Sequence, residues 1–110
     1  MQRLIKEVKT LVSDEYAVAA QKFGPINHSD HESFAVLGEE VEELRDEFTV
    51  VVDKCQEFWK FVKSNASNDK KKDVLKAIRN DAIMAACEAI QVAAMAYKAE
   101  QTIIHRGEEQ

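Results

Sequence analysis

The sequence of 110 residues contains little that would interrupt a helix, with one proline and three glycines. It has only two cysteines and no CxxC pair or zinc-finger spacing, so nothing indicates a zinc site. Cys55 and Cys87 lie at or near apolar positions of helical patterns, and we expect both to be reduced core residues rather than a disulfide. The sequence also lacks a glycine-rich phosphate loop and a Ser–His or Cys–His pair typical of a nucleophile.

An excess of positive charge and long hydrophobic runs are absent as well. The formal net charge is −5, and the one basic cluster, Lys70 to Lys72, reads as part of a solvated loop. Nucleic-acid binding needs a basic surface, so it is not expected. The opening residues MQRLIKEVK lack the apolar block of a signal peptide, and no apolar run approaches the length that spans a bilayer. We therefore expect one cytoplasmic domain, residues 1–110, without a membrane or nucleic-acid partner.

Helical periodicity fills most of the chain and is interrupted at two polar segments. In FGPINHSD, Gly24 and Pro25 end one helix, and Ser29 with Glu32 fits the capping box that begins the next. The second interruption is SNASNDKKK, residues 64–72. The sequence thus predicts an all-α fold, with helices over about residues 2–22, 30–63 and 72–104.

Two of the predicted helices carry apolar residues in alternating steps of four and three, which form a packing stripe. The stripe of the second helix consists of Leu37, Val41, Leu44, Phe48, Val51, Cys55, Phe58 and Val62. That of the third is mostly alanine and consists of Leu75, Ile78, Ala82, Ala85, Ala89, Val92 and Ala96. We expect these helices to pack antiparallel in a helical bundle that a homodimer or homotetramer completes. The alternative is a monomer in which the first helix covers the remaining apolar surface.

Acidic residues crowd the stretch LGEEVEELRDEF, residues 37–48. At about 100° per residue, Glu40 and Glu43 lie on one flank of the apolar stripe, whereas Glu39 points away from it. In the third helix Glu88 lies beside the alanine stripe, with Gln91 one turn later. The sequence therefore places carboxylates from two facing helices near each other.

Such carboxylates repel one another and lose hydration together, and a divalent cation relieves both effects. Ligation by oxygen atoms alone indicates Mg²⁺, or Mn²⁺, rather than zinc. The alternative is an acidic face that is simply solvated.

The acids also form two recognisable motifs. Residues 39–43 read EExxE, and Glu88 with Gln91 has the spacing of ExxD. With the FGP…HES segment before them and EAIQVAAMA at residues 88–96, the sequence resembles the MazG-type all-α nucleoside triphosphate pyrophosphohydrolases, especially the short stand-alone MazG-like proteins. The match covers residues 23–47 and 88–96, about a third of the chain.

The resemblance implies Mg²⁺-dependent hydrolysis of a nucleoside or deoxynucleoside triphosphate to the monophosphate and pyrophosphate, a reaction that can clear modified nucleotides. It implies Glu40, Glu43 and Glu88 as metal ligands and Gln91 at the position of a fourth. Glu39 would bind a further ion or orient the attacking water. Two features depart from the family. Gln91 stands where ExxD has aspartate, which removes a charge, and the segment between the two motifs is longer than usual.

Other residues are candidates for substrate binding. Lys22 and Lys54 are considered as phosphate contacts. Phe34, Trp59 or Phe48 could stack on the base, although aromatic residues at helical spacing more often belong to a core. The alternative function is a non-catalytic helical oligomer or partner-binding module that has kept the fold.

Overall fold

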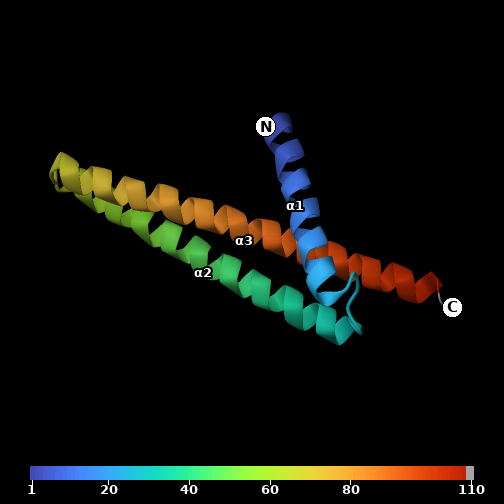
Figure 1. Cartoon of the computed structure of the whole chain (residues 1–110). Helices are drawn as coiled ribbons and strands as arrows, with labels where there is room; N and C mark the ends of the chain where they lie inside the picture. Colours follow the sequence, from blue (N-terminus) through green and yellow to red (C-terminus); the bar gives the residue numbers. More distant parts are fainter. Residues whose placement is uncertain (109–110) are drawn as a thin grey trace.

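The computed structural model describes residues 1–108, which form three α-helices and contain no strand. They are α1 (Gln2–Phe23), α2 (Asp30–Lys63) and α3 (Asn68–Glu108). The all-α prediction is confirmed, and the first two helices agree with their predicted bounds to within one residue. Figure 1 shows α2 and α3 as a long antiparallel pair, with α1 crossing α3 near the end of the pair that holds the α1–α2 connection.

The connection between α1 and α2 follows its sequence signals. Gly24 ends α1 with a φ of 93°, a conformation that glycine adopts at little cost. Ser29 caps α2, because its Oγ accepts a hydrogen bond of 3.1 Å from the backbone N–H of Glu32. The Glu32 carboxylate accepts from the backbone N–H of His28 at 3.3 Å, so the reciprocal half of the capping box reaches one residue further back.

The third helix begins four residues earlier than predicted. Lys70 to Lys72 were expected in a loop, and this expectation is wrong, because they lie in the first turns of α3. The Ser67 hydroxyl accepts a 3.2 Å hydrogen bond from the backbone N–H of Lys70, which caps the helix. Lysines are unfavourable near a helix N-terminus, whereas Asp69 in the first turn is favourable there. The serine cap and the aspartate therefore outweigh the three cations.

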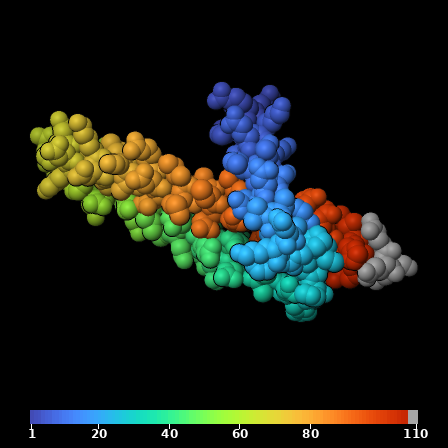
Figure 2. Space-filling view, in the orientation of Figure 1, coloured from blue at the N-terminus to red at the C-terminus, as the bar shows by residue number. Residues whose placement is uncertain are grey.

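The described chain is elongated rather than compact. It measures 66 × 30 × 23 Å, and its Cα radius of gyration is 18.6 Å, against about 13 Å for a compact domain of this length. The backbone of α1 approaches α3 but not α2 within residues 1–108. In Figure 2 the N-terminal half of α1, drawn in dark blue, projects away from the helix pair. The three helices of one chain thus leave the predicted bundle open.

The side of α2 that faces α3 differs from the predicted stripe by a rotation of about one residue. The half-buried positions of α2 run through Leu37, Glu40, Leu44, Glu47, Val51, Lys54, Phe58 and Phe61. Half of the predicted stripe is therefore outside the interface. Val41, Phe48 and Val62 are 45%, 61% and 40% exposed. The predicted apolar stripe is therefore wider than one interface: α3 covers its Leu37, Leu44, Val51 and Phe58 together with the charged residues on one side of it.

The same rotation applies to α3. Its covered positions facing α2 run through Val74, Ile78, Asp81, Ala85, Glu88, Val92 and Met95. The predicted stripe residues Leu75, Ala82 and Ala89 are exposed instead. The cysteines follow this shift: Cys55 and Cys87 are both free, as expected, but both are exposed, so their assignment to the core is wrong.

Few apolar side chains are buried in a single chain. Among residues 1–108 only Val74, Ala94 and Met95 belong to the buried apolar core. Such a core is small for a domain of this length, because domains of about this size normally bury most of their apolar surface. The isolated chain therefore leaves a large apolar surface in contact with water.

By length and composition alone, α3 over Asn68–Gly107 is apolar enough to cross a membrane. The expectation that no segment would pass this criterion is wrong. The core helix of a soluble protein passes it too. Alanine is the most frequent residue of α3, and Glu88 and Gln91 stand in the middle of the helix on its partly covered side.

A small buried hydrogen-bond network fastens the α1–α2 connection to the last turns of α3. The backbone N–H of Asn27 donates to Thr102 Oγ1 at 2.8 Å, and Asn27 Nδ2 donates to Ser33 Oγ at 2.8 Å. The Thr102 hydroxyl in turn donates to the carbonyl oxygen of Lys98 at 2.8 Å. Asn27, Ser33 and Thr102 are all buried, so this network fixes the position of α1 relative to α3.

We predict that Thr102→Val destabilises the protein by about 1–3 kcal/mol, because it leaves the buried N–H of Asn27 without an acceptor. The free energy of unfolding from urea titration measures this change. Thr10→Val is the matched control, since the exposed Thr10 hydroxyl bonds only within its own helix, to the carbonyl of Lys6. Equal effects of the two substitutions would contradict the role of the network.

Candidate metal site

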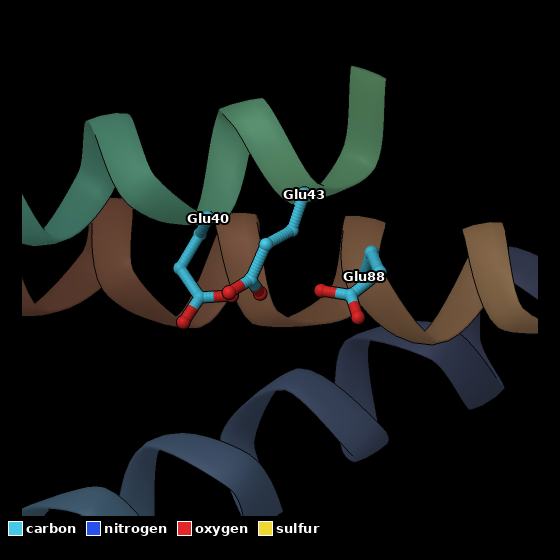
Figure 3. Close-up of side chains that lie close together, drawn as sticks. All are labelled: Glu40, Glu43 and Glu88. Atoms are coloured by element: carbon cyan, nitrogen blue, oxygen red, sulfur yellow. The ribbon is translucent and has the colours of Figure 1, made fainter. Parts of the chain in front are cut away.

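Three carboxyl groups meet where α2 passes Glu88 of α3. Each of Glu40, Glu43 and Glu88 offers an oxygen atom such that these atoms all lie within 4.8 Å of one another. Figure 3 shows Glu40 and Glu43 extending from α2 and Glu88 extending from α3, with their three carboxyl groups side by side. The steps of three within α2 and the antiparallel pairing with α3 bring them together. We call this group the acid cluster.

The electrostatics of the acid cluster are unfavourable when its members are ionised. Burial raises the pKa of Glu40, and the neighbouring charges of Glu43 and Glu88 raise it further. Burial likewise raises the pKa of Glu88, followed by its hydrogen bond and charge interaction with Glu43 and by the charge of Glu47. The fold thus holds these carboxyl groups together at the expense of their ionised forms.

The other acid on the α2-facing side of α3 is neutralised within the chain. Asp81 forms an ion pair and hydrogen bond with Lys54 of α2. No lysine or arginine among the described residues makes an ion pair with the acid cluster. The same interface therefore contains one acid matched by a cation and one group of acids without a cation.

Gln91 lies one turn beyond Glu88 and contacts an acid that the sequence analysis did not consider. Its Nε2 donates a 2.8 Å hydrogen bond to Glu15 Oε2 of α1. An ionised carboxylate only accepts hydrogen bonds, so Gln91 must present its nitrogen to Glu15, which leaves its amide oxygen available to a ligand. Glu15 is separated from Gln91 by most of the sequence, and no local motif marks it.

The remaining predicted site residues lie outside the acid cluster. Glu39 is exposed on α2, and its charge contributes to the raised pKa of Glu40. Lys22 is exposed, with its Nζ 5.6 Å from the ring centre of Phe23. Phe34 is 78% exposed.

The predicted residues in the second half of α2 are too distant to contact a ligand held by the acid cluster directly. Lys54 and Trp59 follow Glu43 by about 16 Å and 24 Å along the helix, at 1.5 Å per residue. Lys54 is committed to Asp81, and Trp59 is 58% exposed with Lys63 Nζ 5.5 Å from its ring centre. Phe48 is exposed on the uncovered side of α2. The structure thus brings together the carboxylates but not the lysines and aromatic residues.

The acid cluster has the donor atoms that a hard divalent cation prefers. Two oxygen atoms on opposite sides of Mg²⁺ lie about 4.2 Å apart, given Mg–O distances of 2.0–2.1 Å. A spread within 4.8 Å needs only small side-chain rotations to reach this value, and Glu43 is exposed and free to make them. The all-oxygen donor set fits Mg²⁺ or Mn²⁺ and does not favour zinc.

Comparisons with protein-family models, with curated proteins and with solved structures found no match to this chain. The relation to MazG-type enzymes therefore stays a prediction that depends on the two motifs and on the geometry of the acid cluster.

The raised pKa values give a pH dependence of stability in the absence of metal. Because the pKa values of Glu40 and Glu88 are higher in the folded protein, their stabilising contribution is complete below the ordinary glutamate pKa of about 4.3 and is lost as the pH rises through the raised values. We predict that Glu88→Gln gains stability relative to the wild type over this interval.

Urea unfolding in EDTA at a series of pH values measures this difference. Glu42→Gln is the matched control, because Glu42 is exposed on α2 outside the acid cluster and its substitution removes one negative charge as well. A pH trend that is the same in both variants would contradict the assignment and reflect the net charge instead.

Proposed function

We propose that the protein is a Mg²⁺-dependent nucleoside triphosphate pyrophosphohydrolase that acts in the cytoplasm, with modified nucleotides among its substrates. The single observation that supports this proposal best is the convergence of Glu40, Glu43 and Glu88 from two helices, with no lysine or arginine in the described part of the chain forming an ion pair with them. These carboxylates occupy the second and third glutamates of EExxE and the first acid of ExxD. A solvated acidic surface has no need to gather them at a partly covered helix interface.

The chemistry assigns distinct roles to the residues. Glu40, Glu43 and Glu88 would hold the ion, with the amide oxygen of Gln91 as the nearest further donor. When bound, Mg²⁺ supplies positive charge that neutralises the phosphate oxygens and orients the triphosphate. Water attacks the α-phosphorus, the bond from this atom to the α–β bridging oxygen breaks, and pyrophosphate leaves. Glu39, exposed beside the cluster, is the candidate for orienting that water.

Gln91 distinguishes this protein from enzymes with a complete ExxD motif. A neutral amide in place of a carboxylate lowers the negative charge of the ligand set, so the ion is bound less tightly. The hydrogen bond between Gln91 and Glu15 keeps a carboxylate of α1 near this position. We expect this pair to compensate in part for the missing charge.

A second candidate function, a non-catalytic oligomer or partner-binding module, is favoured by an uncovered apolar stripe on α2. We define the α2 stripe by residues that recur every seven positions and are all exposed: Phe34, Val41, Phe48, Cys55 and Val62. A heptad repeat of this kind is typical of a helix that packs against another helix. A second copy of the chain is the partner we propose, because one copy buries few apolar side chains and most oligomers are formed by identical subunits.

Binding of Mg²⁺ or Mn²⁺ and release of pyrophosphate test the enzymatic proposal. We expect calorimetry to detect one or more ions bound to the wild type, and a pyrophosphate assay to detect turnover of at least one common, deoxy or modified triphosphate. Glu40→Gln should lose both by a factor of roughly 100 or more, since it removes a ligand from a small set.

Asp46→Asn is the control for that substitution, because Asp46 is exposed on the same helix and outside the acid cluster. It should bind metal and turn over substrate as the wild type does. Metal binding without turnover of any triphosphate would contradict the enzymatic proposal and favour the non-catalytic oligomer.

The oligomer is tested by the mass of the protein in solution. We expect light scattering coupled to gel filtration to give a dimer or tetramer for the wild type, and Phe48→Lys to reduce that mass or lower the melting temperature, because a charge would enter the apolar interface. Thr49→Lys introduces the same charge at the neighbouring exposed position, off the α2 stripe, and should leave the mass unchanged. A monomeric wild type would refute the oligomer.

A further inference from the structure

A cavity of about 360 Å³ opens beside the acid cluster, and all three helices contribute to its walls. Glu40 and Gln91 line the end of the cavity next to the acid cluster. Phe23, Val36 and Met95 supply apolar surface, and Lys98 supplies a cation. Small-molecule pockets have volumes of about 300–1,000 Å³ with mostly apolar walls and a few polar groups. The cavity therefore suits one ring system rather than a whole nucleotide.

Lys98 is the unusual member of this cavity. It is only 6% exposed, and its side chain makes no hydrogen bond or ion pair with any residue between positions 1 and 108. Lysine is almost never buried without a partner. No buried side-chain nitrogen or oxygen in the described chain is both sealed off and unpaired, so the Lys98 nitrogen must have access to open space, which the cavity provides.

The direction of the side chain is consistent with this placement. The charge of Lys98 acts on Glu32 of α2, and both residues line the cavity, so the Lys98 ammonium group lies on the cavity side of α3. Among the described residues, Lys98 makes no ion pair with the acid cluster.

The charges around the cavity indicate what kind of group Lys98 would bind. Two carboxyl groups, Glu32 and Glu40, share the walls with this one cation. The hydrogen bond from His28 lowers the pKa of Glu32, and the charge of Lys98 adds to this effect. A phosphate inside the cavity would be repelled by the carboxylates. A neutral ring with a protruding carbonyl oxygen would accept a hydrogen bond from the lysine and contact the apolar walls.

We propose that this cavity receives the base of the nucleotide, and that Lys98 donates a hydrogen bond to a carbonyl oxygen of that base. The inference rests on the proposed function and names its substrate class: bases with a ring carbonyl, such as thymine, uracil, guanine and cytosine, are preferred over adenine, which has none. Lys98 is then a specificity-determining residue. The lysines and aromatic residues considered from the sequence, Lys22, Phe34, Lys54 and Trp59, are not among those lining the cavity.

Calorimetric titration with deoxynucleoside monophosphates in the presence of Mn²⁺ tests the proposal. We expect dTMP, dGMP and dCMP to bind the wild type at least 10-fold more tightly than dAMP. Lys98→Met should weaken binding of these three roughly 10- to 100-fold, the usual effect of losing a hydrogen bond to a charged group, and should change dAMP binding less than about 3-fold. Lys76→Met is the control, because Lys76 is exposed on the same helix and outside the cavity.

Ala19→Phe provides an independent test that leaves Lys98 intact. Ala19 lines the cavity from α1, so the larger ring should fill it and abolish binding of all four monophosphates while Mn²⁺ still binds. If Lys98→Met does not fold, this variant still tests whether the monophosphates bind in the cavity.

Three results would overturn the base pocket: no nucleotide binding to the Mn²⁺-loaded wild type, equal affinity for dAMP and the others, or a preference that survives in Lys98→Met. Failure of the proposed function has a different signature. If the wild type binds no Mn²⁺, the enzymatic proposal fails, and the same four titrations without metal then decide whether the cavity binds a base at all.

Discussion

Repulsion among three carboxyl groups at the α2–α3 interface is the constraint on which the rest of the structure depends. Glu40, Glu43 and Glu88 are brought within 4.8 Å by the pairing of the two longest helices, and burial raises the pKa of two of them. A helix pair selected for stability alone would place alanine or leucine there, since buried charges rarely improve stability over apolar side chains. The chain thus retains an unfavourable repulsion among carboxylates at a position where a bound cation would remove that repulsion.

The same helix pair also contains an acid that is paired with a cation, in contrast to the acid cluster. Asp81, two turns before Glu88 on α3, is matched by Lys54. The ion pair contributes to the contact between α2 and α3, whereas the acid cluster opposes that contact until a ligand arrives. A cation bound at the acid cluster would therefore also stabilise the packing of the two helices, because any ligand that binds only the folded state stabilises it.

The position of α1 connects the acid cluster with the rest of the molecule. α1 supplies Glu15 to Gln91, its C-terminal residues line the cavity in front of Lys98, and the buried Asn27–Thr102 hydrogen bond fixes the chain directly after it. The edge-to-face contact of Tyr16 with Tyr97, at 4.7 Å between ring centres, holds the same crossing. Residues far from both motifs thus shape the surroundings of the site.

Periodicity and capping were sufficient to predict the helices. Gly24 and Ser29 fix the first connection, and repeated steps of three and four exclude strands, so the all-α fold and the bounds of α1 and α2 follow from local chemistry. The acids could also be grouped in advance, because residues three apart share a helix flank and the two long helices had to face each other. Both ends of α3 were misplaced by four residues: Ser67 caps the helix before three lysines that a helix N-terminus disfavours, and the helix continues past residue 104 to Glu108.

The tertiary structure alone decided which edge of each apolar stripe is covered. The apolar surface of α2 is wider than one helix contact. The sequence was therefore compatible with burying either Val41 and Phe48 or the neighbouring Glu40 and Glu47. In the structure α3 covers Glu40 and Glu47. It also decided the partners of Gln91 and the burial of Lys98, which depend on where α1 crosses α3. A helical pattern fixes the direction of each side chain around its own axis, but the crossing of two helices depends on the shapes of both surfaces.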